Sequence, residues 1–202
     1  MAGLKVIILA AGKSTRMKSD TPKVLHEVAG KPILRYVLEQ AQSLDPKAVV
    51  AVVGHQSERV RSAFNKDPNL SFVEQSEQLG TAHAVQQAHE HLKGFDGDVL
   101  VLCGDVPLLG HDTLRRFYEE FLHQGVEASV LTAYYENPTG YGRIIRDGAG
   151  RFTQIVEEKD CPPELKSMQE CNTGTYLFRN EYLVDTLDKI KNNNAQGEYY
   201  LT

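Results

Sequence analysis

Residues 4–25 read LKVIILAAGKSTRMKSDTPKVL, an apolar run that passes directly into small residues and then into a turn rich in lysine. The apolar run predicts a buried β-strand, and Gly12 follows it in a turn that exposes backbone N–H groups at the carboxyl end of the strand. Backbone N–H groups and mobile cations at a strand end are what the phosphates of a nucleoside triphosphate require. This stretch therefore predicts nucleotide chemistry after the first strand.

The spacing of the glycines narrows the kind of nucleotide site. No glycine recurs between Gly12 and Gly30, so the chain has neither the GxGxxG of a dinucleotide-binding fold nor the GxxxxGK[ST] of a Walker A loop. An alternative interpretation is that residues 10–23 form a solvated loop whose charges only face water. The glycines alone do not decide between these interpretations.

The composition of the chain limits the kinds of partner that it can bind. The 202-residue chain has 22 basic and 27 acidic side chains and a formal charge of -5, which argues against a general nucleic-acid or anionic-membrane partner. Cys103, Cys161 and Cys171 form no CxxC pair and the histidines form no HExxH, so a disulfide framework or zinc site is not indicated and a reducing cytoplasm is favoured. No apolar stretch approaches the roughly 18 residues of a membrane span, and we expect no signal peptide.

Strand and helix patterns alternate over the first half of the chain. Four short apolar runs predict strands that are covered on both faces in a parallel sheet, at residues 4–10, 48–53, 70–74 and 98–103. Helical patterns lie between them, at residues 33–44, 58–64 and 81–92. The repeating order predicts an α/β fold, a three-layer doubly wound and mostly parallel sheet with right-handed crossovers. Ligands of such sheets collect at the carboxyl ends of the strands.

A second polar element reaches the same sheet edge. Gly104 and Asp105 directly follow the run 98–103, and a hard carboxylate there suits a magnesium ion that also binds phosphate oxygens. The alternative is a structural cap for the turn that continues to Pro107. The coincidence of Asp105 with the turn at Gly12 favours the functional interpretation.

The alternation of strand and helix patterns becomes less regular after Leu109. It predicts a helix at residues 113–123, a strand at 128–134, hairpin-like β-structure within 137–158, and a strand within 170–178. No linker composition separates these parts, so we expect one domain over residues 1–202 whose less regular half closes over the ligand.

Seven segments carry a family resemblance that spans nearly the whole chain. In order, they are LAAGKSTRMKSDTPKVLHEVAGKP (9–32), EQSEQLGTAHAV (74–85), CGDVPLL (103–109), NPTGYGRI (137–144), IVEEKD (155–160), NTGTYLF (172–178) and NNNAQGEYYLT (192–202). Together they resemble bacterial N-acetylglucosamine-1-phosphate uridyltransferases, and more closely the N-terminal pyrophosphorylase domain of bifunctional enzymes that also acetylate glucosamine-1-phosphate. The resemblance implies a Rossmann-like nucleotidyltransferase fold and a cytoplasmic enzyme. It also implies that UTP and N-acetylglucosamine-1-phosphate give UDP-N-acetylglucosamine and pyrophosphate with Mg²⁺ as cofactor, for peptidoglycan and lipopolysaccharide precursors.

The same resemblance implies roles for individual residues. Matches to nucleotide-binding positions are Leu9, Ala10, Ala11, Gly12, Lys13, Lys23, Gln75, Gly80 and Thr81, the last three of which read uracil. Matches to catalytic positions are Arg16, Lys23 and Asp105, and Asp105 is also the magnesium ligand. Matches to the sugar site are Gly104, Gly142, Glu157 and Asn172.

Plainer interpretations stay open for several of these residues. Gly80 and Thr81 suit a helix start, Gly142 suits a turn, and Glu157 suits a solvated surface. Ser14, Cys103 and Thr175 depart from the family pattern, but none of these departures removes a charge from the site.

The end of the sequence is the larger departure. The family's second magnesium ligand, an asparagine, lies beyond the position of Thr202, and the hexapeptide repeats of the β-helix acetyltransferase domain do not occur. We therefore expect a piece truncated at its C-terminal end, with weakened metal binding and little or no turnover by itself. The resemblance implies an active parent that is a homotrimer through its β-helix domain. The alternatives are a pyrophosphorylase for another base or sugar, or a non-catalytic sugar-nucleotide-binding module.

Overall fold

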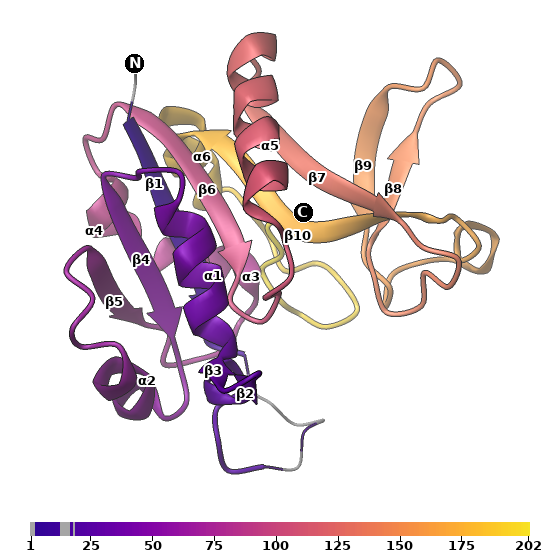
Figure 1. Cartoon of the computed structure of the whole chain (residues 1–202). Helices are drawn as coiled ribbons and strands as arrows, with labels where there is room; N and C mark the ends of the chain where they lie inside the picture. The colour runs from indigo at the N-terminus through magenta and orange to yellow at the C-terminus, as the bar shows by residue number, and fades with distance from the viewer. Residues whose placement is uncertain (1–2, 13–16, 18) are drawn as a thin grey trace.

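An eight-stranded mixed sheet organises the chain in a computed structural model that describes residues 3–12, 17 and 19–202 (Figure 1). Its strand order is β5 (Leu70–Glu74), β4 (Ala48–Val53), β1 (Gly3–Ala10), β6 (Gly97–Cys103), β10 (Glu170–Arg179), β8 (Arg143–Arg146) and β9 (Phe152–Val156), and β7 (Ala128–Tyr134) also pairs with β10. Strands β5, β4, β1 and β6 are parallel. The parallel strands predicted from the four apolar runs are confirmed.

Helices cover both faces of the parallel strands. Because neighbouring side chains of a strand point to opposite faces, Val6 and Ile8 belong to one buried cluster and Ile7 to the other. The first cluster includes side chains of α1 (Ile33–Gln42), α2 (Ser57–Ala63) and α5 (His111–Gln124). The second includes side chains of α3 (Thr81–Gln86), α4 (His89–Leu92) and α6 (Asn180–Leu187). These two clusters confirm the predicted three-layer, doubly wound fold.

The predicted helix 81–92 is interrupted between α3 and α4. The carbonyl of His83 accepts a hydrogen bond from the side chain of Gln87 at 3.0 Å, and the backbone N–H of Gln87 turns to Ala84 at 3.2 Å. This i−3 bond tightens the turn into 3₁₀ geometry. The pattern of apolar residues contained no signal for this competition.

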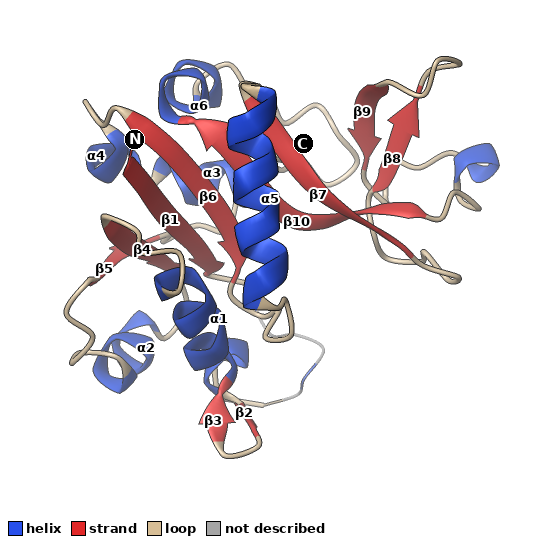
Figure 2. Ribbon diagram, turned by 45° about the horizontal axis from the view of Figure 1, so that its top comes forward, coloured by secondary structure: helices blue, strands red, loops and turns tan. Residues whose placement is uncertain are grey.

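Beyond β6 the sheet is antiparallel around β10, although α5 still connects β6 with β7. Strand β10 pairs antiparallel with β6, β7 and β8, and β8 and β9 form the expected hairpin, which lies away from the helical layers (Figure 2). The register of β10 against β7 shifts between Asn172 and Thr175, so Asn172 lies at an irregularity inside β10. Four short elements complete the chain: η2 (Lys23–Leu25), β2 (Glu27–Val28), β3 (Lys31–Pro32) and η3 (Pro163–Leu165). None of the helices described is both long and apolar enough to cross a membrane.

Candidate functional site

A cavity of about 1,020 Å³ lies at the carboxyl ends of β1, β4, β5 and β6. This is the sheet edge at which doubly wound folds bind ligands. The predicted residues that line it are Leu9, Ala10, Ala11, Gly12, Lys23, Gln75, Gly80, Thr81 and Asp105. Lys13 and Arg16, which were also predicted, lie outside the described residues.

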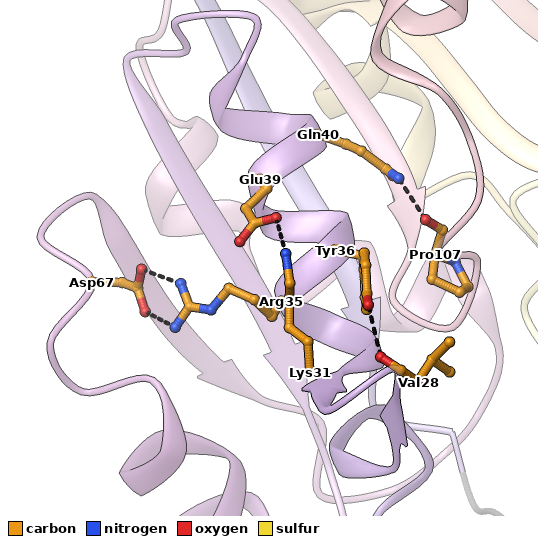
Figure 3. Close-up of polar contacts among 8 residues, drawn as sticks. All are labelled: Val28, Lys31, Arg35, Tyr36, Glu39, Gln40, Asp67 and Pro107. Atoms are coloured by element: carbon orange, nitrogen blue, oxygen red, sulfur yellow. Dashed lines mark hydrogen bonds and ion pairs between the residues drawn. The ribbon is translucent and has the colours of Figure 1, made fainter.

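Lys23 and Asp105 meet at this cavity although 82 residues separate them in sequence. Lys23 begins η2, Asp105 follows β6, and the Nζ of Lys23 donates a hydrogen bond to Oδ2 of Asp105. Helix α1 supports the loop that carries Asp105, because Nε2 of Gln40 donates to the carbonyl of Pro107 at 2.7 Å (Figure 3). The structure thus brings together the lysine-rich turn and the acidic strand end.

Helix α1 is itself fixed to the surrounding chain. Arg35 donates two hydrogen bonds to the carboxylate of Asp67, at 2.7 and 2.9 Å, in the bidentate geometry that arginine favours (Figure 3). At the other side of the helix, the hydroxyl of Tyr36 donates to the carbonyl of Val28 at 2.7 Å. These contacts give the Asp105 loop a rigid support.

Gly80 and Thr81 form the opposite wall, where the C-terminal segment 196–202 crosses the start of α3. The N–H of Ala82 donates to the carbonyl of Tyr199 at 2.8 Å, and the N–H of Leu201 donates to Oγ1 of Thr81 at 2.9 Å. A Cβ atom on Gly80, whose φ is +113°, would lie 2.4 Å from that carbonyl oxygen of Tyr199. Only glycine combines this backbone conformation with this close approach.

Gly142, Glu157 and Asn172 form a second cluster beside the cavity. The N–H of Asn172 donates to the carbonyl of Gly142 at 2.9 Å, and Nδ2 of Asn172 lies 3.5 Å from Oε1 of Glu157. A Cβ atom on Gly142 would lie 3.0 Å from the same carboxylate oxygen. The structure brings these three predicted sugar residues together, although they are not among the residues that line the cavity.

Two successive contacts through Gly174 connect this cluster with the cavity, and a third holds it to the C-terminal end. Cys103, which lines the cavity, contacts the carbonyl of Gly174 at 3.5 Å, and the N–H of Gly174 donates to Oδ1 of Asn172 at 2.9 Å. Thr202 donates to Oε1 of Glu157 at 3.2 Å. Gly104, the fourth predicted sugar residue, packs against β1, where its N–H donates to the carbonyl of Leu9 at 2.9 Å.

Cys103 and Glu157 have pKa values that are shifted from their ordinary values. Burial, followed by the negative charge of Asp105, raises the pKa of the Cys103 thiol to about 12, although Lys23 opposes the shift. Burial also raises the pKa of Glu157, against the hydrogen bonds from Thr202 and Asn172. Cys103 is therefore a neutral thiol at neutral pH, and it is a poor nucleophile because the thiolate is the reactive form.

The donors at the cavity fit a metal ion that arrives with its own ligands. Within the described part of the chain, no three His, Cys, Asp or Glu residues are grouped so as to hold a metal ion. Magnesium commonly binds through one or two carboxylates together with waters and substrate phosphates. Asp105 is one such hard carboxylate, so the chemistry of this donor fits magnesium that is bound to a nucleotide.

Several residues outside the predicted set also line the cavity. They include His55 and Gln56 after β4, Gln78 after β5, and Gln196 and Glu198 in the C-terminal segment. Gln196 and Glu198 lie within the quoted NNNAQGEYYLT segment, which was a signal without an assigned role. His55 and Gln56 follow a predicted parallel strand, and that position alone indicates proximity to the ligand edge.

Comparisons with known proteins agree with this geometry. The family model of the MobA-like NTP transferase domain matches residues 6–175. The "Bifunctional protein GlmU" of Geobacter sulfurreducens is 50% identical over 202 residues, which are 100% of this chain and 42% of that protein. The protein of the same name from Enterococcus faecalis is 50% identical over 196 residues, 97% of this chain and 42% of that protein. The chain thus spans less than half the length of these relatives.

Solved structures share the fold. A putative glucose-1-phosphate thymidylyltransferase from Bacillus anthracis, in complex with a sucrose, aligns with a TM-score of 0.73 and 20% identity over 93% of this chain and 76% of that chain. HddC from Yersinia pseudotuberculosis, complexed with GMP-PN, aligns with a TM-score of 0.69 and 21% identity over 97% of this chain and 82% of that chain. At these identities the likeness concerns the fold alone.

Proposed function

This chain belongs to the family of MobA-like NTP transferase domains, and we propose that it is a uridyltransferase. An oxygen of N-acetylglucosamine-1-phosphate attacks the α-phosphorus of UTP, the bond from that phosphorus to the β-phosphate oxygen breaks, and UDP-N-acetylglucosamine and pyrophosphate are formed. The observation that carries the proposal is the pairing of Lys23 with Asp105 at a cavity on the ligand edge of the sheet. The identity of 50% to bifunctional GlmU supports the choice of substrates.

This reaction needs no general base. A phosphate monoester has a second pKa near 6, so the attacking oxygen is largely ionised at neutral pH. The neutral thiol of Cys103 is consistent with a site that does not use a protein nucleophile. The work left to the protein is positioning and the stabilisation of charge.

Charge repulsion is the main barrier to bringing the two substrates together. Two unit negative charges at 4 Å repel by about 4 kcal/mol at an effective dielectric constant near 20. Lys23 supplies a positive charge at the cavity, and Arg16 is assigned to the same role from the sequence alone. Magnesium, held by Asp105 and by phosphate oxygens, would neutralise charge on the reacting phosphates and on the pyrophosphate when bound.

The two walls of the site are assigned to different parts of the substrates. Leu9 to Gly12 contact uracil and the phosphates, and Gln75, Gly80 and Thr81 hold the uracil ring. Gly142, Glu157 and Asn172 hold the amino sugar, for which the Glu157 carboxylate accepts hydrogen bonds from hydroxyl groups. We place the reaction in a cytoplasm, where the chain's three free cysteines stay reduced, in the supply of cell-wall precursors.

Single-turnover kinetics test this proposal. The chain, in excess over labelled UTP, is mixed with N-acetylglucosamine-1-phosphate and Mg²⁺, so that even slow formation of UDP-N-acetylglucosamine is detected. Matched reactions contain CTP or GTP, or glucose-1-phosphate, and calorimetry measures the binding of each nucleotide. We expect UTP to bind more tightly than CTP and GTP and product to form only with Mg²⁺. Tight binding of UDP-N-acetylglucosamine by the full-length protein without any Mg²⁺-dependent transfer would overturn the proposal in favour of a non-catalytic binding module.

A further inference from the structure

The orientation of the Gln75 side-chain amide is fixed by its neighbours. Gln75 directly follows β5, its N–H donates to the carbonyl of Val53 at 2.8 Å, and the residue is only 3% exposed. Its Nε2 lies 3.0 Å from the carbonyl oxygen of Gly80 and 3.0 Å from Nδ1 of His83. Because a backbone carbonyl only accepts hydrogen bonds, the amide atom beside Gly80 must be the nitrogen.

This arrangement commits both N–H groups of the Gln75 amide. One points to Gly80 and the other to Nδ1 of His83. Within the described part of the chain, Oε1 of Gln75 accepts no hydrogen bond from the protein, and it is not closed off from solvent. Since Gln75 lines the cavity, this oxygen is the polar atom that it offers to a ligand.

We infer that His83 is a positioning residue that holds Gln75 with its oxygen toward the cavity, so that the base site selects a ring edge with an N–H donor. The inference rests on the proposed function and deepens it. Uracil presents an imide N–H, to which Oε1 is complementary. Cytosine presents a bare ring nitrogen at the same place, which sets one acceptor against another. Sites built to hydrogen-bond a group reject analogues that lack it more strongly than apolar pockets do.

The role assigned to His83 requires one tautomer of its ring. Nδ1 accepts from Gln75 only when it carries no proton, so a neutral ring has its proton on Nε2. A second amide nitrogen, Nε2 of Gln87, lies 3.2 Å from Nε2 of His83, and a neutral ring accepts at only one of its two nitrogens. Each amide also donates to a backbone carbonyl at 3.0 Å, but Gln87 is only partly buried, so water can replace the ring as the acceptor of its second N–H, whereas Gln75 is buried.

Three variants separate this inference from a general effect on packing. In His83→Asn, Oδ1 of the new side chain reaches the place of Nδ1 and keeps an acceptor for Gln75. In His83→Gln, the longer side chain puts its amide near the place of Nε2 and leaves Gln75 without that acceptor. Gln87→Met removes the amide on the far side of the ring at nearly constant volume, as a matched control.

Calorimetry on the 202-residue chain measures the dissociation constants of UTP and CTP, and circular dichroism measures the unfolding midpoint. We expect His83→Gln to lower the preference for UTP over CTP about tenfold, the loss of one hydrogen bond to the base-reading amide. His83→Asn and Gln87→Met should keep the preference within about twofold of the unmodified chain. The ratio of the two dissociation constants reports selection, which a uniform loss of packing does not change.

Each result decides between the inference and the proposed function. If the unmodified chain binds UTP no better than CTP, both fail. If it prefers UTP and His83→Gln keeps that preference, the inference alone is overturned. If His83→Asn loses the preference as fully as His83→Gln does, the ring and not its acceptor atom matters, and the positioning role of Nδ1 is overturned. Should His83→Gln fail to fold, His83→Leu, which also removes the acceptor for Gln75, is compared with His83→Asn in the same assay.

Discussion

Gly80→Ala tests whether the C-terminal segment 196–202 is held on the start of α3 as a wall of the cavity. The added Cβ atom would lie 2.4 Å from the carbonyl oxygen, 2.7 Å from the nitrogen and 2.9 Å from the carbonyl carbon of Tyr199. Ordinary contact begins at 3.4 Å, so the backbone at Tyr199 would have to move by about 1 Å. That movement removes the hydrogen bonds from Ala82 to Tyr199 and from Tyr199 to Leu79, which measure 2.8 and 2.7 Å.

The expected cost has two parts. Each lost backbone hydrogen bond contributes about 1 kcal/mol, so the two together contribute about 2 kcal/mol. The conformation of Gly80, with φ 113° and ψ 177°, lies in a region essentially restricted to glycine and adds about 1 to 3 kcal/mol of strain. We expect Gly80→Ala to lower the free energy of unfolding by about 4 kcal/mol. The alternative response is release of the segment, which limits the loss of global stability and exposes its amides.

Urea unfolding and hydrogen exchange at the amides of Tyr199 and Leu201 measure both responses. The matched control is Gly125→Ala, because Gly125 also has a positive φ of 64° but no atom within 4 Å of the place that a Cβ atom would occupy. This control should cost only about 1 to 2 kcal/mol, and exchange at Tyr199 should not change. A loss of stability in Gly80→Ala no larger than in Gly125→Ala, with the amide of Tyr199 still protected, would show that the segment 196–202 is not held against Gly80.

Charged groups give three further predictions. Lys23→Ala should slow single-turnover transfer about a thousandfold, because about 4 kcal/mol of phosphate repulsion is no longer offset, whereas Lys31→Ala, at an exposed ion pair with Glu39, should not. Burial raises the pKa of Glu157, so the folded state binds its proton more tightly than the unfolded chain does, and stability falls as pH rises above the ordinary value of 4.5. Glu157→Gln should therefore raise the unfolding midpoint at neutral pH, with no gain well below pH 4.5. Arg179→Leu should cost about 3 kcal/mol in urea unfolding, because it leaves the fully buried carboxylate of Asp98 without the 2.8 Å hydrogen bond from Arg179.

Each of these predictions has an outcome that contradicts it. If Lys23→Ala transfers the nucleotide at a rate within about threefold of the unmodified chain, Lys23 does not take part in the reaction. If Glu157→Gln raises the unfolding midpoint equally at all pH values, the gain comes from packing and not from the ionisation of Glu157. Tyr118→Phe, which removes the hydrogen bond to the other oxygen of Asp98, should cost about 1 kcal/mol. If Arg179→Leu costs no more than that, the positive charge of Arg179 does not stabilise the buried carboxylate of Asp98.

The parallel half of the fold was predictable because burial on both faces leaves continuous apolar runs. The runs 48–53 and 70–74 coincide with β4 and β5, and the strand at 128–134 coincides with β7. The interruption between α3 and α4 was not predictable, because it depends on the side chain of Gln87, which replaces a backbone N–H as the hydrogen-bond donor to the carbonyl of His83. Helix α6 was not predicted either, although its buried side chains Leu183 and Leu187 are spaced by one helical turn and carried a signal for it.

The site was predictable to the extent that topology alone places its residues. Gly12 and Asp105 follow parallel strands, so the fold brings them to one edge wherever they lie in the sequence. His83, Gln196 and Glu198 depend instead on where α3 and the C-terminal segment pack, and a linear pattern holds no record of that packing. The amino-sugar roles of Glu157 and Asn172 stay predictions, supported by their mutual contact at 3.5 Å.

The ion pair of Lys23 with Asp105 can separate when the substrates bind. The side chains are 41% and 36% exposed, and such exposed pairs contribute only about 0 to 1 kcal/mol to stability. A triphosphate or a divalent cation therefore displaces one partner from the other at little cost. The same exposure lets water screen each charge until the substrates exclude it, after which the electrostatic contribution of Lys23 increases. A weak pair in the absence of ligand is thus compatible with a strong effect on the transfer step, and Lys23→Ala should change the rate of transfer far more than it changes the unfolding midpoint.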